Sequence, residues 1–72
     1  MNISEKTVKT ALVNYICVGK FGKCLNGFSI SDRSRVVDIM ERYGWISSDP
    51  TKIEVTPAGY KVVRDNLHLL QY

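Results

Sequence analysis

The sequence is poor in the side chains that bind metals. Its 72 residues include one histidine, His68, and two cysteines, Cys17 and Cys24. A structural zinc site needs about four ligands, so we expect no intramolecular metal site and no cofactor. We interpret the cysteines as small thiols that line the core of a protein from a reducing compartment. The sequence leaves open whether they ever pair.

The groupings that support catalysis are also missing. His68 is isolated near the end of the chain, and no serine or cysteine has an identifiable base to activate it. Two glycine-lysine pairs lie within residues 19–23, but they lack the flanking glycine and the following serine or threonine of a phosphate-binding loop. We therefore expect a protein without enzymatic activity and infer no small-molecule ligand.

Long apolar runs are absent as well. No run approaches the ~20 residues that a membrane-spanning helix needs, and the first residues do not begin a signal peptide. We therefore expect an intracellular, cytoplasmic protein made of one domain, residues 1–72, with one small core. The net charge of +3 and the pI near 9.0 favour a polyanionic partner.

The first part of the chain predicts a core helix that begins after Ser4. Its inward stripe at helical spacing is Val8, Ala11, Leu12, Tyr15 and Ile16, and its outward residues are Lys6, Lys9, Thr10 and Asn14. Residues 19–27 contain three glycines, which disfavour a helix. We expect this stretch to form a short second helix, with an irregular loop or a short strand as alternatives. In the helical interpretation Phe21, Cys24 and Leu25 point inward, and Lys20 and Lys23 point outward.

Residues 29–43 predict another helix. Ser29 suits the N-cap, and an apolar stripe follows at helical spacing: it is formed by Val36, Ile39, Met40 and Tyr43, with Val37 at its edge. Gly44 suits a left-handed residue after the helix, which would place Trp45 against Met40.

The apolar period changes from 3.6 to 2 after Gly44. Ile53 and Val55 alternate with polar residues, and a proline-containing turn fits residues 49–52. The pattern therefore predicts a two-stranded β-hairpin over about residues 45–56. Thr56 and Pro57 are suited to begin a last helix that runs toward Tyr72.

This order of elements resembles the winged helix-turn-helix superfamily. The residues that carry the resemblance are Val37, Met40, Glu41, Gly44, Trp45, Ile46, Ile53, Val55, Thr56 and Gly59, with the upstream turn at residues 25–29. The resemblance covers the chain from about Gly19 onward. It implies an α+β, mostly helical fold: a three-helix core, a two-stranded wing and a C-terminal helix.

The resemblance also implies a small transcriptional regulator that binds double-stranded DNA. The helix at about 29–43 would enter the major groove, and the wing at about 45–56 would contact the backbone. Arg35 is the expected reader of a guanine edge, and the lysines would contact phosphates. The expected DNA-contacting residues are Ser31, Arg33, Ser34, Arg35, Asp38, Arg42, Lys20, Lys23 and Lys52.

Two alternatives stay open. The outer face of the third helix balances its arginines with Asp38 and Glu41. The domain could therefore instead be a protein-interaction module or a subunit of a larger assembly. The last helix has more apolar surface than a small core needs, so it either packs on the first helix or forms a homodimer. The expected dimer residues are Tyr60, Val63, Leu67 and Leu70.

Overall fold

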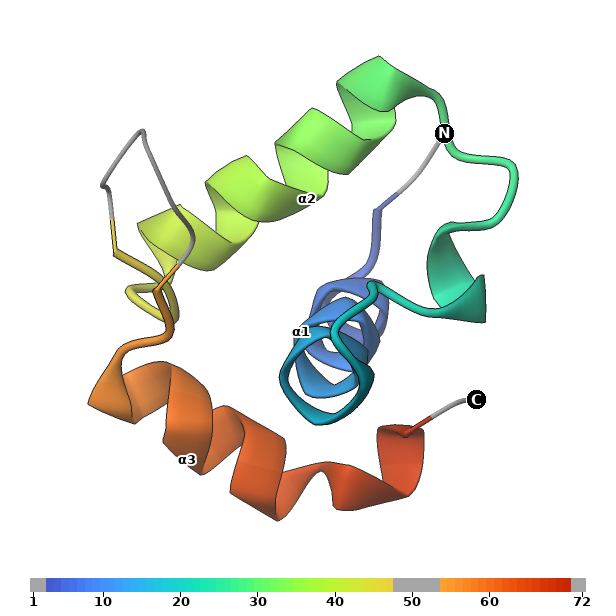
Figure 1. Ribbon diagram of the computed structural model, residues 1–72. Helices are drawn as coiled ribbons and strands as arrows, with labels where there is room; N and C mark the ends of the chain where they lie inside the picture. Colours follow the sequence, from blue (N-terminus) through green and yellow to red (C-terminus); the bar gives the residue numbers. More distant parts are fainter. Residues whose placement is uncertain (1–2, 48–53, 71–72) are drawn as a thin grey trace.

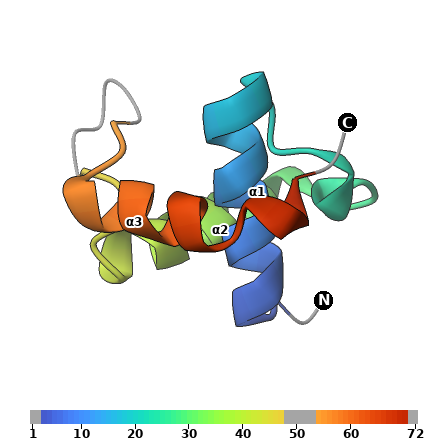
Figure 2. The same cartoon turned by 90° about the horizontal axis from the view of Figure 1, so that it is seen from below.

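The computed structural model describes residues 3–47 and 54–70, which form three α-helices and two single-turn 3₁₀ helices. The elements are α1 (Glu5–Val18), η1 (Lys23–Leu25), α2 (Ile30–Arg42), α3 (Pro57–Asp65) and η2 (Leu67–Leu69). Figure 1 looks nearly along α1 and shows α2 and α3 on opposite sides of it. Figure 2, turned by 90°, shows α3 crossing α1 steeply.

Helix α1 is the centre of the molecule because α2, α3, η1 and η2 all contact it. Its apolar residues Ala11, Leu12 and Val13 are completely buried. Thr10 and Asn14, which we expected to face outward, are also buried, so that expectation is wrong. A helix that is surrounded on most sides has little outer face left, and its polar residues must then bond within the protein.

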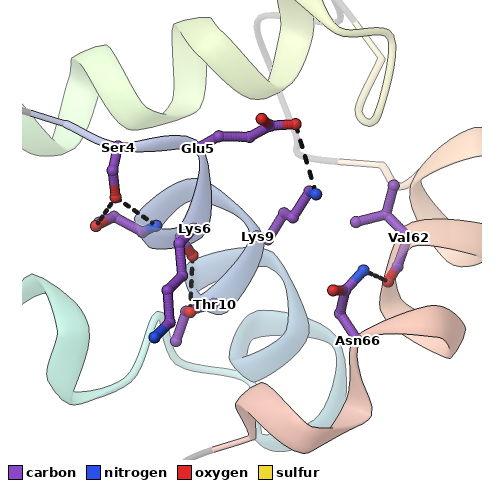
Figure 3. Close-up of polar contacts among 8 residues, drawn as sticks. Ser4, Glu5, Lys6, Lys9, Thr10, Val62 and Asn66 are labelled. Atoms are coloured by element: carbon purple, nitrogen blue, oxygen red, sulfur yellow. Dashed lines mark hydrogen bonds and ion pairs between the residues drawn. The ribbon is translucent and has the colours of Figure 1, made fainter.

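The two buried polar side chains of α1 satisfy that requirement. The Thr10 hydroxyl donates to the Lys6 carbonyl at 2.7 Å, as Figure 3 shows. The Asn14 amide donates to the Thr10 carbonyl at 2.7 Å and to the Leu69 carbonyl of η2 at 3.4 Å. Asn14 therefore fixes the end of the described chain against the central helix.

All three α-helices begin at the N-cap residues expected from the sequence. In each case a side-chain oxygen accepts a bond from a backbone N–H three positions later: Ser4 from Thr7 at 3.1 Å, Ser29 from Asp32 at 3.1 Å, and Thr56 from Gly59 at 3.2 Å. These bonds satisfy N–H groups that have no partner within the helix.

The end of α2 also follows the expected pattern. Gly44 has φ +74°, a left-handed conformation that glycine adopts without a steric penalty. The Trp45 N–H then bonds the Met40 carbonyl at 2.9 Å, and both side chains belong to the core. Tyr43 differs from the expectation, because it is 53% exposed and lies against the Trp45 ring with 4.8 Å between ring centroids.

The expected β-hairpin is not found in the described residues, so the winged-helix fold class is wrong. A single antiparallel bridge joins Ile46 to Val55, and the Ser47 N–H bonds the Glu54 carbonyl at 2.8 Å. An isolated pair of strands is marginal without a third strand or a covering helix. The expected turn at residues 49–52 lies outside the described residues. The expected helical character of the chain is confirmed.

Residues 19–27 form one 3₁₀ turn in place of a regular second helix. Gly22 has φ +85°, outside helical geometry, and a Cβ at this position would lie 2.8 Å from Asn14 Cγ. The side chains nevertheless point as expected: Leu25 is buried, Phe21 and Cys24 are half-buried, and Lys20 and Lys23 are exposed.

The last helix ends earlier than expected, at Asp65. Asn66 follows with φ −128°, and its side-chain amide donates to the Val62 carbonyl at 2.8 Å (Figure 3). Asparagine competes in this way with the backbone bonds that would continue a helix. The chain then turns through η2, so the apolar stripe expected along one continuous helix is interrupted.

Candidate nucleic-acid interface

Helix α2 has one face on the core and one face in solvent. Val36 and Met40 are buried on the core side, with 0% and 1% of their surface exposed. The exposed residues of the helix are Ile30, Ser31, Arg33, Ser34, Arg35, Asp38, Glu41 and Arg42. We call all of these residues except Arg33 the outer face of α2: Ile30, Ser31, Ser34, Arg35, Asp38, Glu41 and Arg42.

The two arginines of the outer face have no ion-pair partner in the part of the chain that the structure describes. Within the described parts of the chain, neither Arg35 nor Arg42 forms an ion pair with a carboxylate, although Asp38 lies at helical spacing from both. Helix α1 does form such a pair, between Lys9 and Glu5 at 3.5 Å (Figure 3). The donors of Arg35 and Arg42 are therefore free to bond a ligand.

The outer face as a whole is electrically balanced, because Asp38 and Glu41 offset Arg35 and Arg42. A balanced face can select a ligand by its hydrogen bonds, but it adds little to the attraction of a polyanion. The positive charge needed for that attraction must come from a neighbouring part of the molecule.

That charge gathers between the end of α1 and the start of α2. A hollow of about 460 Å³ is lined by Val18, Lys20, Phe21, Gly22, Lys23, Asn26 and Arg33. We call it the basic hollow, because three of its described lining residues are cationic and none of the described ones is acidic. It brings together three residues that the sequence analysis assigned to DNA contact.

Several contacts shape the basic hollow. Helix α1 ends where the Gly19 N–H bonds the Tyr15 carbonyl at 3.0 Å, which turns the chain toward η1. Phe21 stacks on the Tyr15 ring with 5.2 Å between centroids. On the opposite wall, the Arg33 guanidinium donates to the Leu25 carbonyl at 3.4 Å. Arg33 thus links the first turn of α2 to η1.

The other expected site residues are dispersed. Ser31, Ser34, Arg35, Asp38 and Arg42 share the outer face, whereas Lys52 lies outside the described residues. Ile30 is not among the expected site residues, yet it is 86% exposed at the first position of α2. A helical wheel would have placed it away from the core, opposite to what its apolar side chain suggests.

The expected dimer residues do not form one surface. Val63 is 6% exposed and belongs to the core of this chain, and Leu70 is half-buried and packs against that core. Tyr60 and Leu67 remain exposed, with 55% and 51% of their surface accessible.

The two cysteines occupy different surroundings. Cys17 is exposed, so its expected place in the core is wrong. Cys24 is half-buried, and its thiol donates to the Phe21 carbonyl at 3.3 Å. Burial raises the pKa of the Cys24 thiol, against the smaller lowering effect of a backbone hydrogen bond.

Two further properties concern the described residues only. No group of three or more histidine, cysteine or acidic side chains is placed to hold a metal ion there. None of the helices there is long and apolar enough to cross a membrane.

In comparisons with known proteins, no family model, no curated protein and no solved structure matches the chain.

Proposed function

We propose that this chain binds double-stranded DNA, with α2 in the major groove and the basic hollow beside the phosphate backbone. The observation that carries the proposal is the gathering of Lys20, Lys23 and Arg33 beside the first turn of an exposed helix. Contacts to phosphates supply most of the affinity of DNA-binding proteins, and they require cations that no nearby carboxylate neutralises.

The outer face would supply sequence selection. Arg35 has no ion-pair partner among the described residues, and its fork of donors matches the O6 and N7 acceptors of guanine. Ser31 and Ser34 lie in the first half of α2 and offer hydroxyls to bases or phosphates. Ile30 offers an apolar group to a thymine methyl. The balanced charge of this face suits selection, because the hollow next to it supplies the non-specific attraction.

The biological role that follows is transcriptional regulation by occupancy of a DNA site. Such a protein needs no catalytic step and acts by its position on the DNA. Residues 45–56 are not assigned a DNA contact in this proposal, because the described residues there form a single bridge.

An interaction module is the second candidate. Tyr60 of α3 and Leu67 of η2 are large, exposed apolar side chains, and α3 lies on the opposite side of α1 from α2 (Figure 1). They are available to a protein partner or to a second copy of this chain. This candidate predicts no dependence on the cations of the basic hollow.

The deciding experiment is fluorescence anisotropy of a labelled random duplex over a range of salt concentrations. We expect micromolar binding that weakens steeply with salt, and Lys23→Ala should lower the salt slope by about 0.9, the value for one lost phosphate contact. The control is Lys61→Ala, which removes the same charge from exposed α3 and should leave the slope closer to that of the wild type. Absence of binding even at low salt would reject the proposal and favour the interaction module.

Selection of a preferred sequence from a random pool allows a second test. Arg35→Ala should cost about 1–3 kcal/mol of binding to the selected site and relax its sequence preference. Arg64→Ala is the matched control, because Arg64 is an exposed arginine on α3, where it pairs with Asp65 at 3.8 Å. Equal losses in both variants would mean that α2 does not read the bases.

A further inference from the structure

The basic hollow has the composition of a small-molecule site as well as that of a phosphate contact. Its volume of about 460 Å³ falls in the range of roughly 300–1,000 Å³ found for ligand pockets. Its lining includes two apolar side chains, Val18 and Phe21, and Val18 is 43% exposed. A DNA phosphate alone would leave this apolar surface in water.

The walls of the hollow are held by contacts that do not involve a ligand. Tyr15 stacks on Phe21, and the Leu25 carbonyl holds the Arg33 guanidinium. Gly22 lies so close to the buried Asn14 that a side chain at this position would clash with it. A preformed site binds more tightly than one whose groups must first be ordered.

We propose that the basic hollow binds a small organic phosphate monoester, with its apolar part against Val18 and Phe21. Three cations, with no carboxylate among the described lining residues, match the double negative charge of a monoester better than the single charge of a carboxylate. Lys20, Lys23 and Arg33 donate to the phosphate oxygens, and burial of the apolar part removes the exposed valine surface from water.

This site has a regulatory consequence that rests on the proposed DNA binding. The cations that hold the monoester are those that would contact the DNA backbone. A bound monoester neutralises them and blocks their access to DNA phosphates. The ligand therefore weakens DNA binding, and DNA weakens ligand binding by the same factor.

The first experiment uses phenyl phosphate as the probe and records backbone amide NMR signals of the whole chain. We expect saturable shifts at Gly22, Lys23, Asn26 and Arg33. Inorganic phosphate lacks the apolar ring of the probe, and phenol lacks its phosphate. Each should therefore bind at least about tenfold more weakly than phenyl phosphate, because it lacks either the apolar burial or the charged hydrogen bonds. Equal affinity for inorganic phosphate, or shifts spread over all exposed lysines, would overturn the proposal.

Variants separate the site from general charge attraction. Lys23→Gln should weaken phenyl phosphate binding about tenfold, as expected for loss of one charge-assisted hydrogen bond. Val18→Ser should weaken phenyl phosphate binding without changing the binding of inorganic phosphate. Lys61→Gln, on exposed α3, is the control and should leave the affinity unchanged. If Lys61→Gln weakens binding as much as Lys23→Gln does, the site is rejected.

Competition distinguishes this proposal from the DNA proposal. Phenyl phosphate should displace a labelled duplex from the wild type, and less so from Val18→Ser. A chain that binds phenyl phosphate but no DNA would keep the ligand site and reject the proposed function. DNA binding without a saturable shift on addition of phenyl phosphate would reject the ligand site and keep the proposed function.

Discussion

Gly59 allows α3 to approach the segment that follows α2. A Cβ at this position would overlap the Trp45 carbonyl oxygen and lie 2.6 Å from Val55 Cγ1. A backbone carbonyl cannot rotate away as a side chain can, so Gly59→Ala must displace the helix. We expect it to lower the free energy of unfolding by about 2–3 kcal/mol, measured by urea denaturation with Trp45 fluorescence.

The neighbouring exposed position provides the control for Gly59. Ala58→Ser adds an atom on the solvent side of the same helix turn and should change the free energy of unfolding by less than about 0.5 kcal/mol. A Gly59→Ala variant as stable as Ala58→Ser would show that α3 does not pack this closely.

The two thiols should differ in reactivity toward iodoacetamide. The thiolate is the reactive form, and burial raises the pKa of Cys24. The folded protein therefore keeps the Cys24 proton to a higher pH than the unfolded chain does. The Cys17→Ser variant retains only Cys24, and the Cys24→Ser variant retains only the exposed Cys17. In the folded state, at a pH near the ordinary thiol pKa of about 8.5, we expect the Cys17→Ser variant to be alkylated more slowly than the Cys24→Ser variant.

The same pKa shift affects stability with a definite sign. Because the unfolded thiol loses its proton first as pH rises, the contribution of Cys24 to stability is complete below the ordinary thiol pKa and decreases above it.

Mass spectrometry of samples taken over time measures the alkylation rates of the two cysteine variants. Equal rates for the two variants across the pH range would contradict the half-buried position of Cys24.

Thr56 connects elements rather than capping one helix alone. Its hydroxyl accepts from the Gly59 N–H at 3.2 Å and donates to the Gly44 carbonyl, and its own N–H bonds the Trp45 carbonyl at 3.0 Å. Thr56→Val keeps the shape but removes the hydroxyl, so we expect a loss of about 1–2 kcal/mol in the free energy of unfolding. Thr56→Ser keeps the hydroxyl and should retain most of that stability. Equal losses in the two variants would mean that the methyl group matters and the bonds do not.

Features that depend on neighbouring residues were predictable from the sequence. An N-cap bond spans three residues, so Ser4, Ser29 and Thr56 could be identified without knowing the fold. The left-handed Gly44 after α2 is another local feature. The prediction of a hairpin was wrong, because an alternating pattern is local whereas strands are stabilised by packing and by partners outside their own sequence.

Tertiary packing decided the features that the sequence could not provide. Thr10 and Asn14 occupy polar positions of an amphipathic pattern, yet η2 and the neighbouring elements cover α1 and bury them. The basic hollow likewise depends on the way η1 brings Lys20 and Lys23 to Arg33 of α2. The sequence shows these three cationic residues, but it does not show that they line the same hollow.

At the scale of the molecule, the net charge of +3 is unevenly placed. The basic hollow combines three cations with no carboxylate in the part of its lining that the structure describes, whereas the outer face of α2 is balanced. Composition predicted attraction to a polyanion, and two of the lysines expected to contact phosphates, Lys20 and Lys23, do line this hollow. Because the charge of the basic hollow is separate from the balanced outer face of α2, we expect mutations in the hollow to change the attraction to DNA and mutations on the outer face to change the sequence preference.

The central position of α1 predicts that the molecule unfolds in one step. Every other helix that the structure describes contacts α1, so loss of its core contacts leaves α2 and α3 without a common support. The unfolding transition followed by Trp45 fluorescence, which reports the junction of α2 and α3, should therefore coincide with the transition followed by far-ultraviolet circular dichroism, which reports all helices. Leu12 is fully buried in α1, and Leu12→Ala should cost about 2–5 kcal/mol and shift both transitions together. A shift in one signal alone would show that α1 does not join the helices into one cooperative unit.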